Sequence, residues 1–240
     1  MRRSDWNQKG GVVIAIDGPA GAGKSTVARE LARRLGMGYL DTGAMYRALT
    51  LEALRRRLDL EDAEALSRLA SSLELESVFL PEESPPYRVL VGGEDVTAGV
   101  RSREVSAHVS QVSSHAAVRA EMVRKQRAMA EGRDMVVEGR DVGTAVFPRA
   151  PVKFFVTASV TERARRRHRE LVMEGHEISL QAVREEMARR DLLDSTRETD
   201  PLRRAPDAEV VDTTGLSVSR VVERLMRRVR ERLEEVSGEP

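Results

Sequence analysis

A glycine-rich run near the start of the chain carries one lysine and two hydroxyl side chains, and it follows an apolar run at 12–16. Its members are Gly18, Pro19, Ala20, Gly21, Ala22, Gly23, Lys24, Ser25 and Thr26. The glycines allow the backbone to turn its N–H groups toward a polyphosphate, because bulky side chains would keep the phosphates out. A helix beginning near Lys24 adds its positive dipole end, while Lys24 can reach the β- and γ-phosphates and Ser25 can bind Mg²⁺. The run therefore predicts a site for ATP or GTP.

Polar residues also follow two other apolar runs. The segment 41–43 comes after a short apolar pair and before Arg47, and Arg140 and Asp141 come shortly after the apolar run at 135–137. The carboxyl ends of parallel strands meet at one edge of a sheet, so we expect these residues to face the glycine-rich loop, where a phosphate acceptor would lie. Arg47 and Arg140 can each hold a phosphate through two charge-assisted hydrogen bonds. The alternative is that either arginine only pairs with a nearby carboxylate.

Two charged stretches, 161–172 and 178–191, have helical periodicity but fewer apolar positions than a core helix needs. Arg163, Arg166 and Arg167 share one helical face in the first stretch, and Arg190, Asp194 and Arg197 would share one face if the second stretch continues as a helix past residue 191. Phosphoryl transfer needs such positive charge, because its transition state spreads negative charge over the equatorial oxygens. The alternative is a solvated face with i,i+4 ion pairs, such as Glu162 with Arg166 or Arg190 with Asp194.

Along the chain, short apolar runs alternate with helical patterns. The runs that predict strands are 12–16, 39–40, 135–137, 152–156 and 209–211, and helical patterns occupy 27–35, 44–58, 103–114, 116–130 and 218–233. This alternation predicts parallel strands with right-handed crossovers. We therefore expect an α/β protein with the P-loop NTPase fold, in which a five-stranded parallel sheet is flanked by helices.

The alternation is interrupted once. A short helical pattern at 61–75 precedes two predicted strands, 76–80 and 87–91, on either side of a proline-rich turn. We therefore expect 60–100 to form an inserted β-containing lobe, which divides the core kinase domain into 11–59 and 101–240. The charged helical pair, at about 160–192, is expected to form a mobile lid within the core domain, and 1–10 a flexible tail.

The composition narrows the class of protein. Lys and Arg total 40 and Asp and Glu total 39, a net charge of +1 that argues against a dedicated nucleic-acid binder. The absence of cysteine fits a reducing cytoplasm. No apolar run approaches the ~20 residues of a membrane span, and the basic N-terminus lacks the apolar segment of a secretory signal. We expect a cytoplasmic monomer that binds neither nucleic acid nor membrane.

Six ordered motifs together point to a family. They are GPAGAGKST, LDTGAMYRA, GEDVTAGVRSREV, SQVSSHAAVR followed by KQRAM, EGRDVGTAVFP and RRDLLDSTR. From about residue 12 to 235 the chain resembles bacterial cytidylate kinases, and the insertion at 60–100 resembles their extended monophosphate-binding domain. The resemblance implies transfer of the γ-phosphate of ATP to CMP or dCMP, with Mg²⁺, in pyrimidine metabolism. Thr42 stands where the family pattern has serine, and either hydroxyl can donate to a phosphate.

The resemblance also implies roles for single residues. Residues 18–26 would hold ATP, with Ser25 on Mg²⁺. Contacts to the acceptor's phosphate region would come from Thr42, Arg47 and Arg140, with Asp141 as a polar organiser. Cytosine would be read by Ser110, Arg119 and Arg197, and the sugar or adjoining phosphate would be held by Arg190 and Asp194. The residues implied in catalysis are Lys24, Arg140, Arg163, Arg167 and Arg190, of which Arg163 and Arg167 would come from the lid.

Two alternatives to this reading differ in what they predict. One is a P-loop kinase for another small acceptor, such as UMP or a hydroxyl metabolite. The other is a nucleotide-dependent switch that binds nucleotide and acts through a partner, without phosphoryl transfer to a monophosphate. The chain has no Asn-Lys-x-Asp motif for reading guanine and no long second domain of the kind found in motors and helicases.

Overall fold

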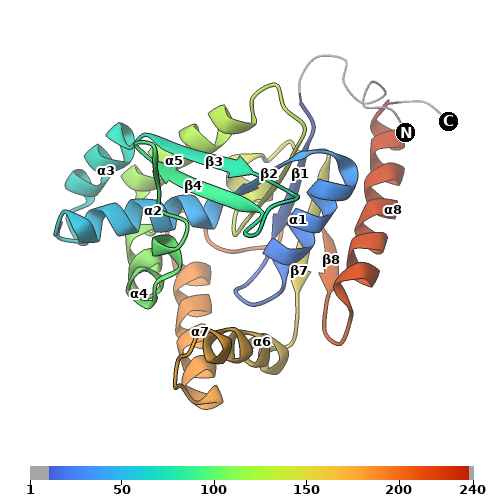
Figure 1. The fold of residues 1–240 in the computed structure, drawn as a ribbon. Coiled ribbons are helices and arrows are strands. Elements are labelled where there is room, and N and C mark those ends of the chain that lie inside the picture. The colour runs from blue at the N-terminus through green and yellow to red at the C-terminus, as the bar shows by residue number, and fades with distance from the viewer. Residues whose placement is uncertain (1–10, 238–240) are drawn as a thin grey trace.

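A computed structural model describes the chain from residue 11 to residue 237 (Figure 1). Its main sheet has five parallel strands in the order β2-β6-β1-β7-β8. The strands are β1 (Val13–Asp17), β2 (Gly38–Asp41), β6 (Met135–Gly139), β7 (Val152–Thr157) and β8 (Glu209–Asp212). Every residue of β1 and β6 is buried, as expected for central strands covered on both faces. The predicted P-loop fold with a five-stranded parallel sheet is confirmed.

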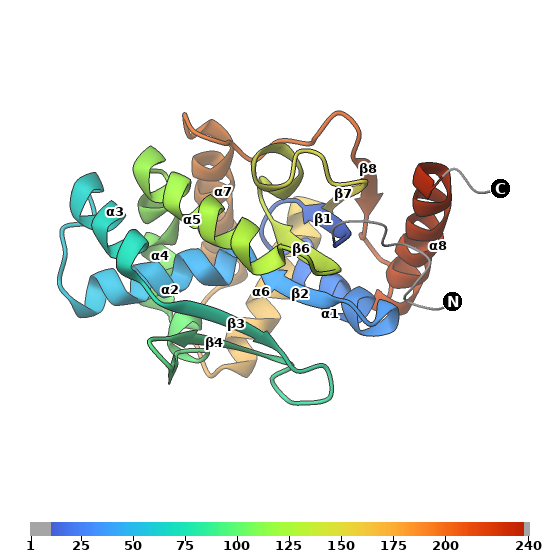
Figure 2. The same cartoon turned by 90° about the horizontal axis from the view of Figure 1, so that it is seen from above.

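Eight α-helices lie among the described residues. They are α1 (Lys24–Leu35), α2 (Thr42–Arg55), α3 (Ala63–Ser72), α4 (Arg103–Val112), α5 (Ala116–Ala130), α6 (Val160–Met173), α7 (Leu180–Thr196) and α8 (Val218–Ser237). Helices α1 and α8 pack against each other, and α5 lies on the other side of the sheet from α1 (Figure 2). No helix in the described part of the chain is both long and apolar enough to cross a membrane.

A second, antiparallel sheet lies beside α2. Its strands β3 (Leu75–Phe79), β4 (Tyr87–Val91) and β5 (Glu94–Asp95) pair in the order β3-β4-β5. The two longer strands agree with the expected strands 76–80 and 87–91. This sheet is not a separate unit in its packing, because Tyr87 and Val89 belong to the same buried cluster as the main sheet.

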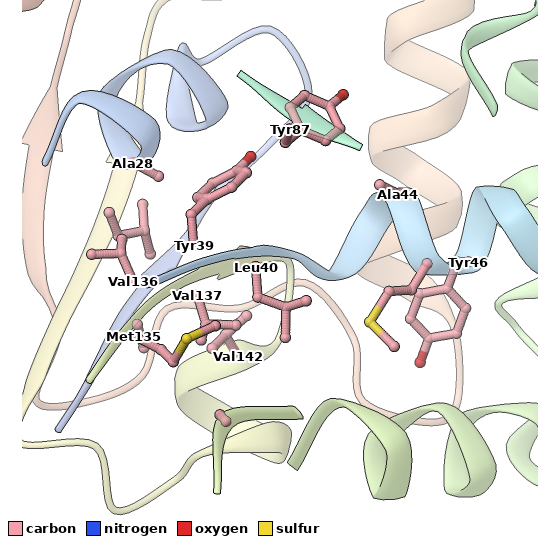
Figure 3. Close-up of a cluster of buried hydrophobic side chains, with 14 of the residues drawn as sticks. Ala28, Tyr39, Leu40, Ala44, Tyr46, Tyr87, Met135, Val136, Val137 and Val142 are labelled. Carbon is pink, nitrogen blue, oxygen red and sulfur yellow. The ribbon is translucent and has the colours of Figure 1, made fainter. Parts of the chain in front are cut away.

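The main core fills the space between the sheet and its helices. Figure 3 shows part of it, where Tyr39 of β2 lies near Tyr87 of β4 and beside Val136, its partner in β6. The rings of Tyr39 and Tyr87 meet edge to face with centroids 6.0 Å apart. Burying such large rings stabilises the contact between the inserted strands and the main sheet.

The pair α6 and α7 is packed differently. The two helices lie together below the sheet in Figure 1, and their buried residues Ala164, Leu171, Val183 and Met187 form a small cluster of their own. Ala20 of the glycine-rich loop packs against this cluster. Helix α7 continues to Thr196, five residues beyond the expected helical stretch.

Two short elements were not expected from the sequence. A 3-10 turn covers Gly99–Arg101, and a π-helix covers Val142–Val146 directly after Asp141. Helix α2 begins at Thr42 rather than Ala44, because the Asp41 side chain accepts a hydrogen bond from the backbone N–H of Ala44 and caps the helix. The expected tail 1–10 lies outside the described residues.

Candidate functional site

The glycine-rich loop connects β1 to α1. Gly18, Gly21 and Gly23 all have positive φ angles, and a side chain at Gly18 would lie within 1.9 Å of the Val156 carbonyl oxygen. The backbone therefore follows a path that larger residues would disturb. Helix α1 begins directly after the loop, so its first N–H groups have no carbonyl acceptor in a preceding turn, and Gly23 caps the helix without a side-chain hydrogen bond.

Lys24 is buried at the beginning of α1. Its Nζ donates to the carbonyl oxygen of Pro19 at 2.9 Å, which holds the ammonium across the loop. Burial lowers the pKa of Lys24 to about 7, and the positive charge of Arg140 adds to this effect. A polyphosphate at this point would stabilise the charged ammonium.

A pocket of about 900 Å³ opens from the loop toward the carboxyl ends of the strands. The residues expected in the site that line it are Ala20, Gly21, Ala22, Gly23, Lys24, Ser25, Thr26, Thr42, Arg47, Ser110, Arg140, Asp141, Arg167, Arg190, Asp194 and Arg197. Four expected residues do not line it: Gly18, Pro19, Arg119 and Arg163. The pocket thus brings together side chains from both halves of the sequence.

One polar network on the pocket wall is centred on Asp194 of α7. Arg140 donates through Nε to Asp194 at 2.9 Å, and the Ser110 hydroxyl donates to the other carboxylate oxygen at 3.1 Å. Burial alone would raise the pKa of Asp194, but Arg140 and Arg190 hold it below its usual value. No Arg190–Asp194 ion pair occurs among the described side chains. Asp194 pairs instead with Arg140, which follows β6, so the i,i+4 pair given as an alternative does not form.

Arg190 itself has unused hydrogen-bonding capacity. Its Nε is buried and has no hydrogen-bond partner in the described part of the chain. Burial lowers the pKa of Arg190 to about 9, and the neighbouring positive charges of Arg47 and Arg140 contribute. Three arginines thus repel one another at one place in the pocket, an arrangement that an anion would relieve.

A second network lies deeper and is centred on Asp141. Arg119 is 1% exposed, forms an ion pair with Asp141 through Nη2, and donates through Nε to Asp200 at 2.9 Å. Arg197 lies 3.3 Å from the other oxygen of Asp141 and also donates to the Asp200 carbonyl oxygen. Arg119 additionally stacks over the Tyr46 ring, 5.4 Å from its centroid. The two arginines hold Asp141 between them at the pocket wall.

Two residues of α2 complete this end of the pocket. Arg47 donates to the Ser106 hydroxyl at 2.7 Å from Nη1 and leaves its other guanidinium nitrogens without a hydrogen bond to described residues. The Thr42 hydroxyl donates to the Glu138 carbonyl oxygen at 2.8 Å, and this hydrogen bond links the start of α2 to β6.

The three arginines on α6 have different surroundings. Arg163 is buried and donates to the carbonyl oxygens of Ala20 and Ala158 and to Asp191. Arg166 pairs with Glu162, as expected for an i,i+4 pair, and also bonds Thr213. Arg166 and Arg167 both line the pocket, and the Arg167 side chain is 32% exposed and pairs with Glu170 on its own helix. Of the three, Arg167 has the most exposed side chain, and its ion pair is within α6 rather than to the loop or to Thr213, so it is the best placed to reach a ligand.

Two buried carboxylates next to the loop were missed at the sequence level. Asp17 accepts hydrogen bonds from the N–H groups of Val142 at 2.8 Å and Gly143 at 2.7 Å, and burial raises its pKa to about 6. Glu138 accepts from the Tyr39 hydroxyl at 2.8 Å, interacts with Ser25, and has a pKa raised by burial. The available signal was an acidic residue at the carboxyl end of an otherwise apolar strand.

Comparisons with known proteins place this geometry in context. A family model described as cytidylate kinase matches residues 14–231. The cytidylate kinase of Geobacillus kaustophilus (strain HTA426) is 54% identical over 222 residues, which cover 92% of this chain and 98% of the relative. That of Mycobacterium avium (strain 104) is 50% identical over 224 residues, 93% of this chain and 97% of the relative. Among solved structures, an uncharacterized protein from Eubacterium ventriosum ATCC 27560 is similar with a TM-score of 0.50 at 11% identity, covering 91% of this chain and 98% of that one.

Proposed function

The chain belongs to the cytidylate kinase family, and we infer that it transfers the γ-phosphate of ATP to CMP or dCMP, giving ADP and CDP or dCDP. One observation carries this proposal: the glycine-rich loop and three closely spaced arginines, Arg47, Arg140 and Arg190, line the same pocket. A donor polyphosphate and an acceptor phosphate would meet there, with positive charge on both sides of the transferred group.

On the donor side, residues 18–26 would hold the phosphates of ATP. Backbone N–H groups of the loop would supply most of the contacts, and Lys24 would exchange the Pro19 carbonyl oxygen for the β- and γ-phosphates. This exchange replaces a neutral partner with an anionic one. Binding of ATP would therefore return the Lys24 ammonium to its charged form.

On the acceptor side, Thr42, Arg47 and Arg140 would contact the phosphate of CMP. Arg47 and Arg140 lie on different elements and both line the pocket, so their guanidinium groups can bind different oxygens of one phosphate. Arg190 and Asp194 would hold the sugar or the adjoining phosphate. The positive charge of these arginines would then be neutralised by the substrate.

Cytosine would be read by Ser110, Arg197 and Asp141, with Arg119 behind them. Cytosine has an exocyclic amino group that donates, and a ring nitrogen and a carbonyl that accept, so a carboxylate and an arginine match its edge. Arg119 would act through its ion pair with Asp141, or bind the base after exchanging a partner. Uracil puts a carbonyl where cytosine has the amino group, and an unmatched buried polar group costs about 1 to 3 kcal/mol.

Catalysis would rest on positive charge rather than on a covalent intermediate. Lys24, Arg140 and Arg190 all line the pocket and would surround the phosphoryl group as it moves, and Arg167 would approach from the lid at about 160–192. Arg163 would stabilise the attachment of this lid to the loop through its bond to the Ala20 carbonyl oxygen. Closure would exclude water, which competes as phosphate acceptor.

Mg²⁺ fits the residues at the loop, although no group of three His, Asp or Glu side chains that could hold a metal occurs within residues 11–237. Mg²⁺ commonly keeps several waters and takes one or two protein oxygens together with substrate phosphates. The Ser25 hydroxyl lines the pocket beside Glu138 and can serve as that protein ligand. The ion would neutralise charge that develops on the phosphates.

The remaining proposals concern organisation. Residues 60–100 would form the inserted lobe that borders the monophosphate, with 11–59 and 101–240 as the kinase core. We further propose that the protein acts as a monomer in the cytoplasm and binds no nucleic acid, consistent with its balanced charge.

The test is to follow the phosphate itself. ATP carrying a radioactive γ-phosphate is incubated with Mg²⁺ and CMP, and the products are separated. The proposed function predicts label in CDP, with ADP unlabelled. Label in inorganic phosphate alone would contradict transfer to CMP and favour a hydrolytic switch.

A further inference from the structure

Asp17 ends β1 directly before the glycine-rich loop, and the residue is 4% exposed. Both carboxylate oxygens are used: Oδ1 accepts from the Val142 N–H at 2.8 Å and Oδ2 from the Gly143 N–H at 2.7 Å. These two N–H groups begin the π-helix Val142–Val146. The next three, from Thr144 to Val146, all bond the Asp141 carbonyl oxygen. Asp17 thus caps this short helix from a neighbouring strand.

The segment that Asp17 holds lies just beyond the sheet. The pairing of β1 with β6 ends at Asp17 opposite Gly139, and the pairing of β2 with β6 ends one residue earlier, at Glu138. Beyond Gly139 the backbone leaves the sheet, and Asp141 has φ −144° and ψ 20°. Arg140 and Asp141 therefore lie between the last ladder contact and the Val142 and Gly143 N–H groups that donate to Asp17.

The loop side of Asp17 has independent support. Strand β1 lies between β6 and β7, and Asp17 is in register with Gly139 on one side and Phe155 on the other. The start of the loop is held by both neighbours whether or not the Asp17 side chain makes hydrogen bonds. Loss of the carboxylate should then disturb the segment after β6 much more than the loop.

From this geometry we propose that Asp17 is a positioning residue: its carboxylate fixes Arg140 and Asp141 relative to the phosphate-binding loop and so sets the distance between acceptor and donor. The inference rests on the proposed function, because it takes Arg140 and Asp141 as contacts of the acceptor. Burial raises the pKa of Asp17 to about 6, in keeping with a carboxylate kept in an apolar setting for its bonds to backbone N–H groups.

Asp17→Asn is the direct test, since it keeps the shape and turns one acceptor oxygen into an NH₂ group that faces an N–H donor. We expect the Kd of CMP, measured by calorimetry, to rise by about 10-fold to 100-fold, the range for an unmatched buried polar group. The Kd of a non-hydrolysable ATP analogue should stay within about twofold of wild type, because the loop keeps its strand pairing.

Asp134→Asn is the matched control. Asp134 also accepts a backbone hydrogen bond through its carboxylate, from the Val12 N–H at 2.8 Å, but it lies before the opposite end of β6. Both Kd values should be unchanged in this variant. Should Asp17→Asn not fold, Gly143→Ala replaces it: the added methyl would lie 3.2 Å from Asp17 Oδ2 and 3.1 Å from Lys153 Cδ, and should weaken CMP binding in the same selective way.

The possible results separate this inference from the proposed function. Two results would overturn the positioning role alone. One is that folded Asp17→Asn binds CMP with the same Kd as the wild-type protein. The other is that Asp17→Asn weakens the binding of CMP and of the ATP analogue equally. Failure of the wild-type protein to bind or phosphorylate CMP would overturn the proposed function and the inference together.

Discussion

The two ends of the pocket are built in different ways. The donor end is one continuous segment, residues 18–26, whose shape comes from glycines with positive φ angles and from a helix N-terminus. The acceptor end combines side chains from α2, α4, α7 and the turn after β6, joined by ion pairs around Asp141 and Asp194. The donor end therefore depends mainly on backbone geometry, whereas the acceptor end depends on how distant segments pack. Substitutions at the two ends should separate the handling of ATP from that of CMP.

The largest effect is expected at the donor end, from Lys24→Ala. We expect kcat to fall by about 1000-fold or more, because the ammonium stabilises charge on the transferred phosphate. ADP release at saturating CMP measures this. Lys125→Ala serves as the control, since Lys125 binds the carbonyl oxygens of Ser71 and Leu73 away from the pocket. A near-normal rate for Lys24→Ala would exclude the loop from catalysis.

Arg190→Ala should have the next largest effect. Its buried Nε has no partner among described residues and its charge is crowded by Arg47 and Arg140, so the guanidinium is available to the phosphoryl group. We expect kcat to fall by about 100-fold, with a smaller change in the KM of ATP. Arg189→Ala, at the exposed neighbouring position, should behave as wild type. Similar activity of the two variants would contradict the assignment.

Arg119→Ala sharpens the comparison because it should affect one substrate only. Removing the guanidinium leaves Asp141 with one fewer ion pair at the base site, and we expect the KM of CMP to rise by about 10-fold to 100-fold. The KM of ATP should change little. Arg124→Ala, which removes an exposed arginine from the same helix, is the control. Equal increases for CMP and ATP would mean that Arg119 has only a structural role.

The smallest effect is expected from the lid. Arg167 is partly exposed and pairs with Glu170, so solvent screens its charge. Arg167→Ala should lower kcat by about 5-fold to 10-fold, as expected for a group that approaches only on closure. Arg165→Ala, at an exposed position of the same helix, should leave kcat unchanged. Equal kcat values for the two variants would remove Arg167 from the transition state.

The different construction of the two ends also explains what could be predicted from the sequence. The loop was visible because residue type and spacing determine its backbone, and the five strands were visible because each is a short apolar run. The position of Arg47 and Arg140 beside the loop followed from the rule that parallel strands end at one edge of a sheet. These predictions needed no knowledge of side-chain packing.

The partners of the acceptor-end side chains could not be predicted in this way. Local spacing favoured an Arg190–Asp194 pair, but packing of α7 against the turn after β6 gives Asp194 to Arg140 instead. Likewise, Arg163 and Arg167 are one helical turn apart, yet one is buried against the loop and the other lines the pocket. Such choices depend on crossing angles and on competition between partners far apart in the sequence.

The most direct test of the account is the selectivity of the acceptor end. ADP formation from ATP and Mg²⁺ is measured with each nucleoside monophosphate in turn, and the Lys24→Ala protein serves as the blank. We predict strong turnover with CMP and dCMP and little with AMP, GMP or UMP. The absence of turnover with every monophosphate, despite tight binding of ATP, would contradict phosphoryl transfer to a cytidine nucleotide in this pocket.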